Sequence, residues 1–375
     1  MASIERVLIA GGGIAGMSLA IALGRVGIAA TIVEIDPDWR VYGAGITITG
    51  PSLRAFDALG LLDRIVSEGY CHNATRICGA DGHVIVPSRV AGRPLGEHIP
   101  NSGGILRPVL HRILSEATRA SGAEVRLGVS VAKLEQRGEG VSATLSDGAA
   151  FSADLVVGAD GIHSRMREML FPDAPKPVLT GQGCWRAVVP RPQEFDFAEV
   201  YVGGPVKAGI VPVSQAEMYL FLLQHVPDNP RIPEERFPAL LGDQLRDFGG
   251  ALGAIRDGLG PSSRINYRPL EKLLLPPPWH RGRAVLIGDA AHATTPHLAS
   301  GAGLAVEDAL VLADLLSSDL PVDDALKQFT ARRYDRCRMV VENSVRLGEL
   351  EMARVAGEEQ AALQRSSMLA LNAPI

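Results

Sequence analysis

The residues of clearest chemical meaning are the glycines of the segment Gly-Gly-Gly-Ile-Ala-Gly at 11–16, which has G-x-G-x-x-G spacing. Gly11 permits a tight turn, Gly13 lets a pyrophosphate approach the backbone, and Gly16 lets a helix pack closely on a strand. We expect Ile14 and Ala15, at the start of that helix, to direct unpaired backbone N–H groups at the phosphates. The segment therefore predicts a dinucleotide site.

An acidic residue completes this motif. Glu34 follows Gly16 by 18 residues and comes directly after an apolar, β-branched segment at 30–33. Its carboxylate can accept hydrogen bonds from a ribose diol. Segment 7–10 predicts a strand before the glycines, and segment 14–26 predicts a helix after them. A glycine-rich turn without a ligand is the alternative, and the motif does not separate FAD from NAD.

Two later segments distinguish these cofactors. Residues 158–167 read Gly-Ala-Asp-Gly-Ile-His-Ser-Arg-Met-Arg, and residues 288–309 begin Gly-Asp-Ala-Ala-His-Ala-Thr-Thr-Pro and end Ala-Val-Glu-Asp-Ala. The first resembles the D-G-x-x-S-x-x-R motif of group A flavoprotein monooxygenases, and the second their G-D-A-A-H-x-x-x-P segment. Gly-Ala-Gly-Ile at 43–46 resembles the flavin-side loop of that family. In this order the segments are similar to p-hydroxybenzoate and salicylate hydroxylases over nearly the whole chain.

The resemblance implies how FAD would be bound. Asp289 would hydrogen-bond the ribityl hydroxyls, although capping of a helix is an alternative role for it. Backbone N–H groups of Gly301 and Ala302 would stabilise negative charge on the reduced flavin, and Pro296 would form a rigid turn at the ring edge. The resemblance assigns further cofactor contacts to Ile46, Arg107, Val131 and Asp160.

The implied reaction is the hydroxylation of a small aromatic or heteroaromatic substrate, of the phenol, hydroxybenzoate, salicylate or hydroxypyridine type. NADH or NADPH would reduce FAD, and O₂ would then react through a flavin hydroperoxide. One departure concerns the oxygen pocket: many members have Gly where this chain has Ala299 and Gln where it has Ser300. We therefore expect FAD to bind, with the departure confined to the shape of the oxygen pocket.

Substrate contacts are expected on the strand at 218–226. Tyr219, Phe221, Leu223 and His225 alternate along it and so share one face. If that face lies toward the flavin, His225 would be the catalytic base, Tyr219 a hydroxyl anchor, and Phe221 and Leu223 the apolar walls. The alternative is that this face is ordinary core.

Arg186 is a second substrate candidate. It follows Trp185, and its guanidinium could bind a substrate carboxylate with two hydrogen bonds. An ion pair that joins two domains is the alternative role, and the residue type favours neither.

The elements needed to position these groups predict an α/β protein. The opening strand, helix and strand form a βαβ unit and so a parallel sheet. Successive strands at 183–226 predict an antiparallel sheet, and an apolar strand at 284–287 returns to the parallel pattern. We expect a Rossmann-type FAD-binding domain of the p-hydroxybenzoate hydroxylase fold, with an inserted substrate domain on a mostly antiparallel β-sheet. The FAD domain would comprise residues 1–71, 99–180 and 270–375, and the substrate domain residues 72–98 and 181–269.

The remaining pattern predicts further elements. A hairpin is expected within 72–98, with its turn at Asp81-Gly82. Helices are expected at 52–61, 108–121, 234–248, 301–317 and 322 to about 353, and strands at 129–134, 141–145 and 155–157.

Composition excludes several classes of protein. The chain has 375 residues, 46% of them hydrophobic, and a net charge of −5. This charge gives no basic surface for nucleic acid, and no apolar run is long enough for a membrane span. The four cysteines are scattered, which argues against a zinc site or a disulfide framework and favours a cytoplasmic protein. The sequence leaves a monomer and a homodimer open.

Other functions remain possible from the sequence. A halogenase or a reductase of the same fold is one, but the three tryptophans do not form the W-x-W-x-I-P motif of halogenases. A dehydrogenase that uses only a nicotinamide cofactor is another, and a non-catalytic FAD-binding protein is a third. A flavin absorption spectrum would exclude the dehydrogenase, and substrate-stimulated O₂ uptake would exclude the non-catalytic protein.

Overall fold

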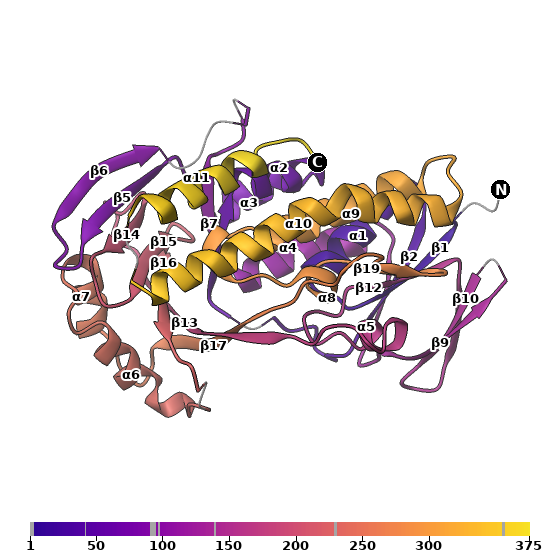
Figure 1. Cartoon of the computed structure of the whole chain (residues 1–375), viewed down its shortest axis with the longest axis horizontal. Coiled ribbons are helices and arrows are strands. Elements are labelled where there is room, and N and C mark those ends of the chain that lie inside the picture. The colour runs from indigo at the N-terminus through magenta and orange to yellow at the C-terminus, as the bar shows by residue number, and fades with distance from the viewer. Residues whose placement is uncertain are drawn as a thin grey trace.

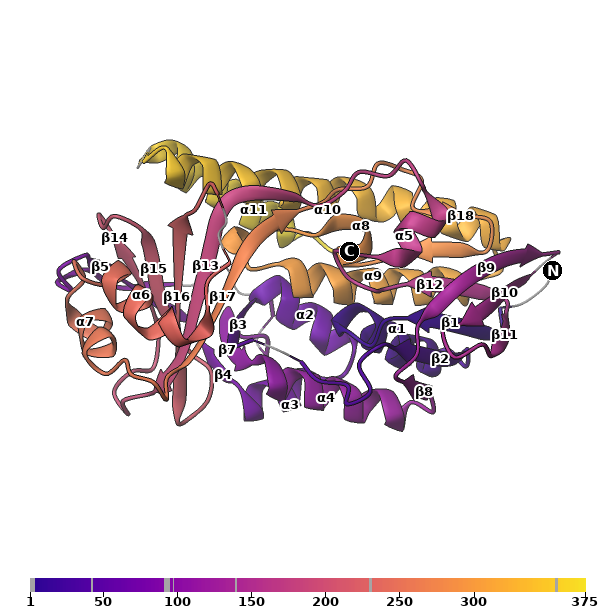
Figure 2. The same cartoon turned by 90° about the horizontal axis from the view of Figure 1, so that it is seen from below.

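The computed structural model describes residues 4–41, 43–90, 95–96, 98–138, 140–228, 231–354 and 357–375. Figures 1 and 2 show an elongated molecule, with a six-stranded sheet toward one end and a seven-stranded sheet at the other. The long helix α10, Val322–Met352, runs along the molecule beside both (Figure 1). The arrangement leaves the loops of the first sheet facing the second.

The six-stranded sheet has the order β18-β19-β12-β1-β2-β8, and only β18 runs antiparallel to its neighbour. Helix α1, Ile14–Arg25, is the crossover that connects the parallel strands β1 and β2. Because β1, β12 and β19 are parallel, the loops that follow them meet at one edge of the sheet. The strands are β1 Arg6–Ala10, β2 Ala29–Glu34, β8 Glu124–Leu127, β12 Leu155–Gly158, β18 His280–Arg281 and β19 Ala284–Leu286.

Three helices position the loops that follow β1, β12 and β19. Helix α9, Gly301–Leu316, packs against α1 and α2, Gly50–Ala58. A Cβ atom on Gly303 would overlap the side chain of Ser52, so the absent side chain lets α9 and α2 approach closely. The N-termini of α1 and α9 consequently lie near the same sheet edge.

The seven-stranded sheet has the order β17-β13-β16-β15-β14-β5-β6. Its neighbouring strands are antiparallel except β14 and β5. Thus strands from 74–90 and from 178–272 join in one sheet. The strands are β5 Ala74–Gly79, β6 Val84–Val90, β13 Val178–Pro190, β14 Ala198–Val202, β15 Lys207–Pro212, β16 Glu217–His225 and β17 Arg264–Lys272.

One face of this sheet is covered by α6, Phe237–Gln244, and α7, Gly250–Asp257. Trp185 of β13 is 1% exposed and packs on Phe237 and Tyr267 on that side. Side chains alternate along a strand, so Cys184 and Arg186 point to the opposite face. That opposite face lies toward the loops that follow β1, β12 and β19.

The remaining elements are short or peripheral. Two three-stranded sheets have the orders β3-β7-β4 and β11-β10-β9. The elements are β3 Gly45–Thr49, α3 Leu62–Glu68, β4 Tyr70–His72, β7 Ser102–Leu106, α4 Arg107–Ala120, β9 Val131–Arg137, β10 Gly140–Leu145, β11 Ala150–Ala153, α5 Arg165–Leu170, η1 Glu234–Arg236, α8 Asp289–His292, η2 Pro296–Leu298 and α11 Glu358–Leu371.

The sequence pattern misplaced a few elements. The helix expected at 52–61 is α2, which ends at Ala58, and Gly60, where φ is +69°, separates it from α3. The helix expected at 234–248 is η1 and α6 and ends at Gln244. Strand β17 was not predicted, because its alternation is interrupted by charged residues and a proline. Among the described helices, none is both long and apolar enough to cross a membrane.

Candidate active site

A cavity of about 1550 Å³ lies between the two large sheets. Its walls come from the loops after β1, β12 and β19, from one face of the seven-stranded sheet, and from α11. Ligand pockets for one small molecule commonly measure about 300–1,000 Å³. The cavity is therefore large enough for a cofactor together with a second ligand.

The glycine turn after β1 opens onto this cavity. Gly11 has φ +107°, and a Cβ atom there would overlap the carbonyl of Ala159. A Cβ atom on Gly16 would overlap the Gly11 carbonyl, whereas one on Gly13 would meet nothing within 4 Å. Gly13, Ile14 and Ala15 line the cavity. The turn is thus shaped by Gly11 and Gly16, and its open side is at Gly13.

Glu34 stabilises this turn through hydrogen bonds with the backbone. Its carboxylate accepts hydrogen bonds from the backbone N–H groups of Gly12, at 2.7 Å, and Asp36, at 2.9 Å. The indole of Trp39 donates to the Gly12 carbonyl at 2.8 Å. A carboxylate has about four acceptor positions, so Glu34 can still bind a ribose. That contact stays a prediction.

The Asp-Gly motif after β12 has mainly a structural part. The Asp160 carboxylate accepts the hydroxyl of Ser164 and the N–H of Met166 at the start of α5. Arg167 donates to the carbonyl oxygens of Ile162 and Ala290 at 2.7 and 2.9 Å, and so joins this loop to the one after β19. Gly161, next to Asp160, lines the cavity. A cofactor contact here would come from this glycine and from backbone groups.

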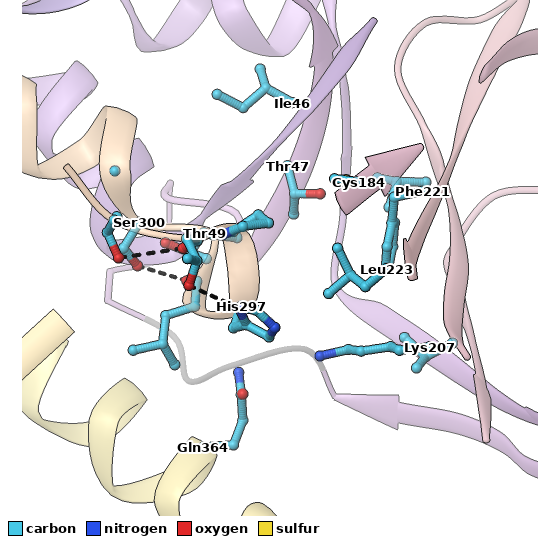
Figure 3. Close-up of a pocket in the computed structure, with 18 of the residues that line it drawn as sticks. Ile46, Thr47, Thr49, Cys184, Lys207, Phe221, Leu223, His297, Ser300 and Gln364 are labelled. Atoms are coloured by element: carbon cyan, nitrogen blue, oxygen red, sulfur yellow. Dashed lines mark hydrogen bonds between the residues drawn. The ribbon is translucent and has the colours of Figure 1, made fainter. Parts of the chain in front are cut away.

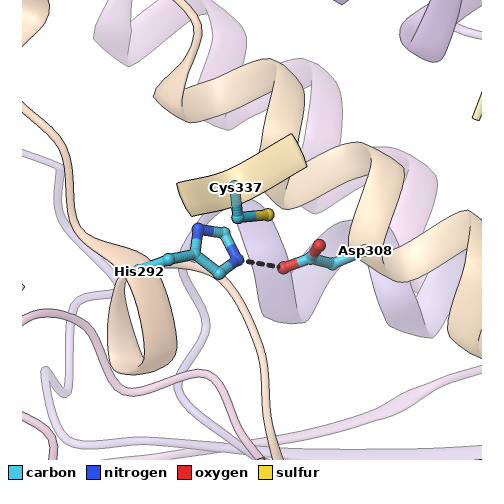
Figure 4. A group of neighbouring side chains, drawn as sticks. All are labelled: His292, Asp308 and Cys337. Carbon is cyan, nitrogen blue, oxygen red and sulfur yellow. Dashed lines mark hydrogen bonds and ion pairs between the residues drawn. The ribbon is translucent and has the colours of Figure 1, made fainter. Parts of the chain in front are cut away.

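The turn at Gly288, before Asp289, is held by a buried ionic network (Figure 4). Asp308 of α9 accepts the Gly288 N–H at 2.9 Å, His292 Nε2 at 2.6 Å and Arg333 Nε at 2.8 Å. Burial disfavours the charged carboxylate, but His292 and Arg333 outweigh it and lower the pKa of Asp308 to about 2. Cys337 lies beside this pair. Both Asp308 oxygens accept hydrogen bonds, so this group stabilises the turn before Asp289.

Asp289 itself faces the cavity with an exposed side chain. Burial within the protein raises the pKa of this carboxyl, while His292 and Arg107 oppose that shift. Arg107 also lines the cavity and fits beside Gly43, where a Cβ atom would lie 2.7 Å from its Cδ. Burial and the neighbouring Arg186 lower the pKa of Arg107. Asp289 and Arg107 thus present opposite charges to the same space.

The loop from Pro296 to Ala302 forms the next part of the wall. Ala299 has φ +47° and ψ +34°, the left-handed region that favours glycine. This conformation explains why a glycine suits the position, and the chain tolerates alanine there. Gly301 and Ala302 begin α9, and their backbone N–H groups are at the positive end of a 16-residue helix.

The seven-stranded sheet presents its residues in register. Directly opposite residues in antiparallel strands share a face. Arg186 of β13 is opposite Phe221 of β16, and Cys184 is opposite Leu223, which is opposite Lys207 of β15. All five line the cavity, and Figure 3 shows Phe221, Leu223 and Lys207 on its sheet side.

Tyr219 lies on the same face, one position earlier on β16 than Phe221 in the alternation. Its ring fills the space beside Gly45, where a Cβ atom would overlap it, and its hydroxyl is 2.6 Å from Thr47 Oγ1. Burial raises the pKa of Tyr219, so its hydroxyl keeps its proton at neutral pH. Ile46, the neighbour of Thr47, also lines the cavity.

Comparison with known proteins gives a consistent result. Residues 5–344 match a family model described as an FAD binding domain. The chain is 34% identical over 349 residues to 2-heptyl-3-hydroxy-4(1H)-quinolone synthase of Pseudomonas aeruginosa, covering 92% of this chain and 89% of the relative. It is 33% identical over 351 residues to aurachin C monooxygenase/isomerase of Stigmatella aurantiaca, with 92% and 89% covered.

The chain belongs to the FAD binding domain family. A solved structure supports the same fold: Klebsiella pneumoniae HpxO complexed with FAD and uric acid superposes with a TM-score of 0.83, at 24% identity, covering 98% of this chain and 92% of the other. The protein is an FAD-dependent monooxygenase of the aromatic hydroxylase type, which confirms the predicted family, fold and cofactor.

The cavity of this FAD-binding protein fits that cofactor. Gly13 leaves open space at a helix N-terminus, where a diphosphate would bind. The Asp289 carboxylate faces the cavity, where it can accept hydrogen bonds from the hydroxyls of a ligand. These are the phosphate and ribityl positions expected from the sequence, and their roles stay predictions.

Six sequence-predicted residues are not part of the cavity wall: Gly11, Gly16, Glu34, Val131, Asp160 and His225. His225 is exposed at the end of β16, opposite Gln182, and its role as the catalytic base stays a prediction. Val131 begins β9 and is 3% exposed, but it is not part of the cavity wall. A contact between Val131 and the cofactor stays a prediction.

One polar cluster on the wall was missed by the sequence reading. Lys207 Nζ lies 2.7 Å from Glu351 Oε1, and His297 Nε2 lies 3.1 Å from Glu351 Oε2. Thr295 Oγ1 is 2.9 Å from His297 Nδ1. The side chains of His297 and Glu351 are 0% and 10% exposed. No spacing rule could find this cluster, because its members come from β15, η2 and α10.

Proposed function

We propose that this enzyme hydroxylates the ring of an anionic aromatic or heteroaromatic compound, with NADH or NADPH and O₂ as co-substrates. We infer the anionic character of the substrate from the surroundings of Arg186. Its side chain lines the cavity, and none of the described residues forms a hydrogen bond or an ion pair with it. A guanidinium in a cavity without an acidic partner favours a carboxylate ligand.

The charge around Arg186 supports this choice. Arg107 lies close enough to influence it, and each cation disfavours the other. Two neighbouring cations create a positive potential that attracts an anion into the cavity. We assign Arg107 to the cofactor side and Arg186 to the substrate, because Arg186 is on the sheet face with Phe221 and Leu223.

The protein groups then have separate tasks. FAD, when bound, would accept the hydride of the nicotinamide and would activate O₂. Phe221 and Leu223 pack on the substrate ring and exclude water, and Arg186 orients it. The protonated hydroxyl of Tyr219, held by Thr47, can donate a hydrogen bond to a substrate oxygen. Pro296 bounds the cavity on the cofactor side.

The experiment is a screen of aromatic and heteroaromatic acids with the purified holoenzyme. We expect one group of acids to accelerate NADH or NADPH oxidation with O₂ uptake, and the product to be heavier by one oxygen atom. Arg186→Met should raise KM for the acids by about tenfold to a hundredfold, because a charge-assisted hydrogen bond contributes about 1.5–3 kcal/mol. Stimulation by neutral rings only, with no effect of Arg186→Met, would contradict the proposal.

The domain division stays part of this proposal. We propose that residues 72–98 and 181–269 form the substrate domain, since their strands join in one sheet whose face lines the cavity. We also propose a cytoplasmic monomer or homodimer, because all four cysteines are free thiols and no pair is bonded. Size-exclusion chromatography with light scattering would decide between monomer and dimer.

A further inference from the structure

The cavity contains a second cation on the sheet face that the proposed reaction does not use. Lys207 is the first residue of β15, and its side chain is 25% exposed. Figure 3 shows it extending from the sheet side toward His297. An ammonium group has three donors, and among the described residues only Glu351 accepts one of them. Two donors are therefore free to meet a ligand.

Lys207 and Arg186 stand at opposite ends of an apolar strip. Phe221 is opposite Arg186, and Leu223 is opposite Lys207. Both Phe221 and Leu223 belong to β16, which lies between β13 and β15. Two strand spacings across the sheet and two residues along it separate the two cations. With ordinary sheet dimensions, their Cα atoms are about 12 Å apart. A flat ring system fits on the strip with one end at each cation.

The two cations differ in charge balance. Glu351 is paired with Lys207 and hydrogen-bonded to His297 and Gln360, the latter at 3.3 Å. This carboxylate neutralises Lys207, whereas Arg186 has no acidic partner in the described parts of the chain. A compensated cation donates hydrogen bonds without requiring a second anion. The pair of sites therefore matches a ligand with one negative charge.

His297 does not compete for this role. Its two ring nitrogens are bonded to Thr295 and Glu351, so it orients the carboxylate and is a positioning residue. Arg354, Arg365 and Gln364 line the outer part of the cavity, on the side of α11. The first two are exposed, so their charge is screened by solvent.

We propose that Lys207, held by Glu351, is a second substrate-recognition residue, and that the substrate is a planar aromatic monoanion with a neutral hydrogen-bond acceptor, such as a carbonyl oxygen, at the end opposite its carboxylate. The inference rests on the proposed function, since it takes Arg186 as the carboxylate site. It narrows the substrate class to acids with two separated acceptors.

The test compares two probes by titration of the flavin absorbance of the holoenzyme. 4-Hydroxyquinoline-2-carboxylate, whose oxo tautomer has an acceptor opposite the carboxylate, is compared with quinoline-2-carboxylate, which lacks that oxygen. We expect the oxygen-bearing probe to bind at least about tenfold more tightly. Lys207→Met should abolish this difference and leave the Kd of quinoline-2-carboxylate within about twofold of its original value. Lys207→Arg should preserve part of it.

Two further variants sharpen the result. Lys133→Met is the matched control, because Lys133 is an exposed strand lysine paired with Glu135 at 2.7 Å, on β9 and off the cavity wall. It should leave both affinities unchanged. Glu351→Gln removes the compensating charge from Lys207. It should therefore reverse the preference in favour of a dianion, quinoline-2,4-dicarboxylate.

Several outcomes would overturn the inference. Equal binding of the two quinoline acids by the unaltered enzyme would do so, as would an equal loss for both in Lys207→Met. A fall in thermal stability of Lys207→Met and Glu351→Gln without any change in probe preference would show a structural tie between β15 and α10 instead. Absence of binding by all three probes would also count against it. The acid screen and Arg186→Met test the proposed function separately.

Discussion

Asp289 is the residue whose surroundings are hardest to explain without a ligand. It follows a turn fixed by Asp308, and its own side chain faces the cavity. Burial raises the pKa of the carboxyl, and the helix that begins at Asp289, α8, is only four residues long. The alternative role as a helix cap therefore explains little of its placement. Hydroxyl groups of a bound cofactor would give it the missing partners.

Asp289→Asn is expected to weaken FAD binding and leave the fold intact. Loss of a charge-assisted hydrogen bond costs about 1.5–3 kcal/mol, or about tenfold to a hundredfold in Kd. Fluorescence titration of the apoenzyme with FAD measures this. Asp319→Asn is the control, because Asp319 is exposed and off the cavity wall. A Kd within twofold of the original would remove Asp289 from the cofactor site.

His225→Ala tests whether His225 is the catalytic base. The side chain is exposed and outside the cavity, so we expect kcat/KM to change by less than about twofold, as for most surface substitutions. Steady-state kinetics over pH 6 to 9 with the best acid from the screen would check this. Loss of the pH dependence of kcat/KM in this variant would show that His225 acts as the base.

Among elements, the contact of α9 with the loop after β19 has the largest consequence. Asp308 lies in the buried middle of α9, yet its partners belong to the segment after β19 and to α10. The helix thus supplies backbone N–H groups at its N-terminus and, through Asp308, fixes the turn before Asp289. The packing that permits this depends on Gly303 and Ser52.

Asp308→Asn should destabilise the protein strongly. Removal of one partner of a buried ion pair costs about 3–5 kcal/mol, because His292 would stay buried without its carboxylate and Arg333 would keep only Glu307. Urea unfolding measured by circular dichroism would show the loss. Asp314→Asn on the same helix is the matched control: that carboxylate is 69% exposed and pairs with Arg332 at 3.1 Å. Similar midpoints for the two variants would refute the structural role.

At the scale of the whole molecule, the cluster of Lys207, Glu351 and His297 joins the seven-stranded sheet, helix α10 and η2. Burial lowers the pKa of His297, against the opposing effect of Glu351. Burial would raise the pKa of Glu351, but His297 and Lys207 outweigh it and lower it to about 2. The cluster therefore holds a neutral histidine and a charged carboxylate at neutral pH.

Acid should loosen this connection. The unfolded chain protonates histidine near pH 6.5 and glutamate near pH 4.5, above the folded pKa values, so both groups bind more protons when unfolded. Stability should decline below about pH 6.5 and more steeply from about pH 4.5 toward 2. Thermal unfolding of the holoenzyme at several pH values measures this. In Glu351→Gln the steeper part should be reduced, whereas Glu342→Gln, an exposed pair with Arg338 on the same helix, should retain it. Identical slopes would contradict the role of Glu351.

Local pattern was sufficient for most of the cofactor side. The glycine turn, Glu34 and the segments around Asp160 and Asp289 are contiguous motifs, and each requires one strand, one turn and one helix start. Such units are specified by a few neighbouring residues, so glycine positions and the hydrophobic period are enough to predict them. The alternation of Tyr219, Phe221 and Leu223 likewise predicted one shared face, because a strand has a period of two.

Long-range packing decided the rest. Which residues of β16 line the cavity depends on how far the loops and α11 reach over the sheet. The meeting of Lys207, Glu351 and His297 depends on elements up to 144 residues apart in the sequence. No local period or spacing encodes such a meeting, since it arises only when separate elements bury their apolar faces together. The chain's motifs thus identify the cofactor, and its three-dimensional packing decides which side chains line the cavity.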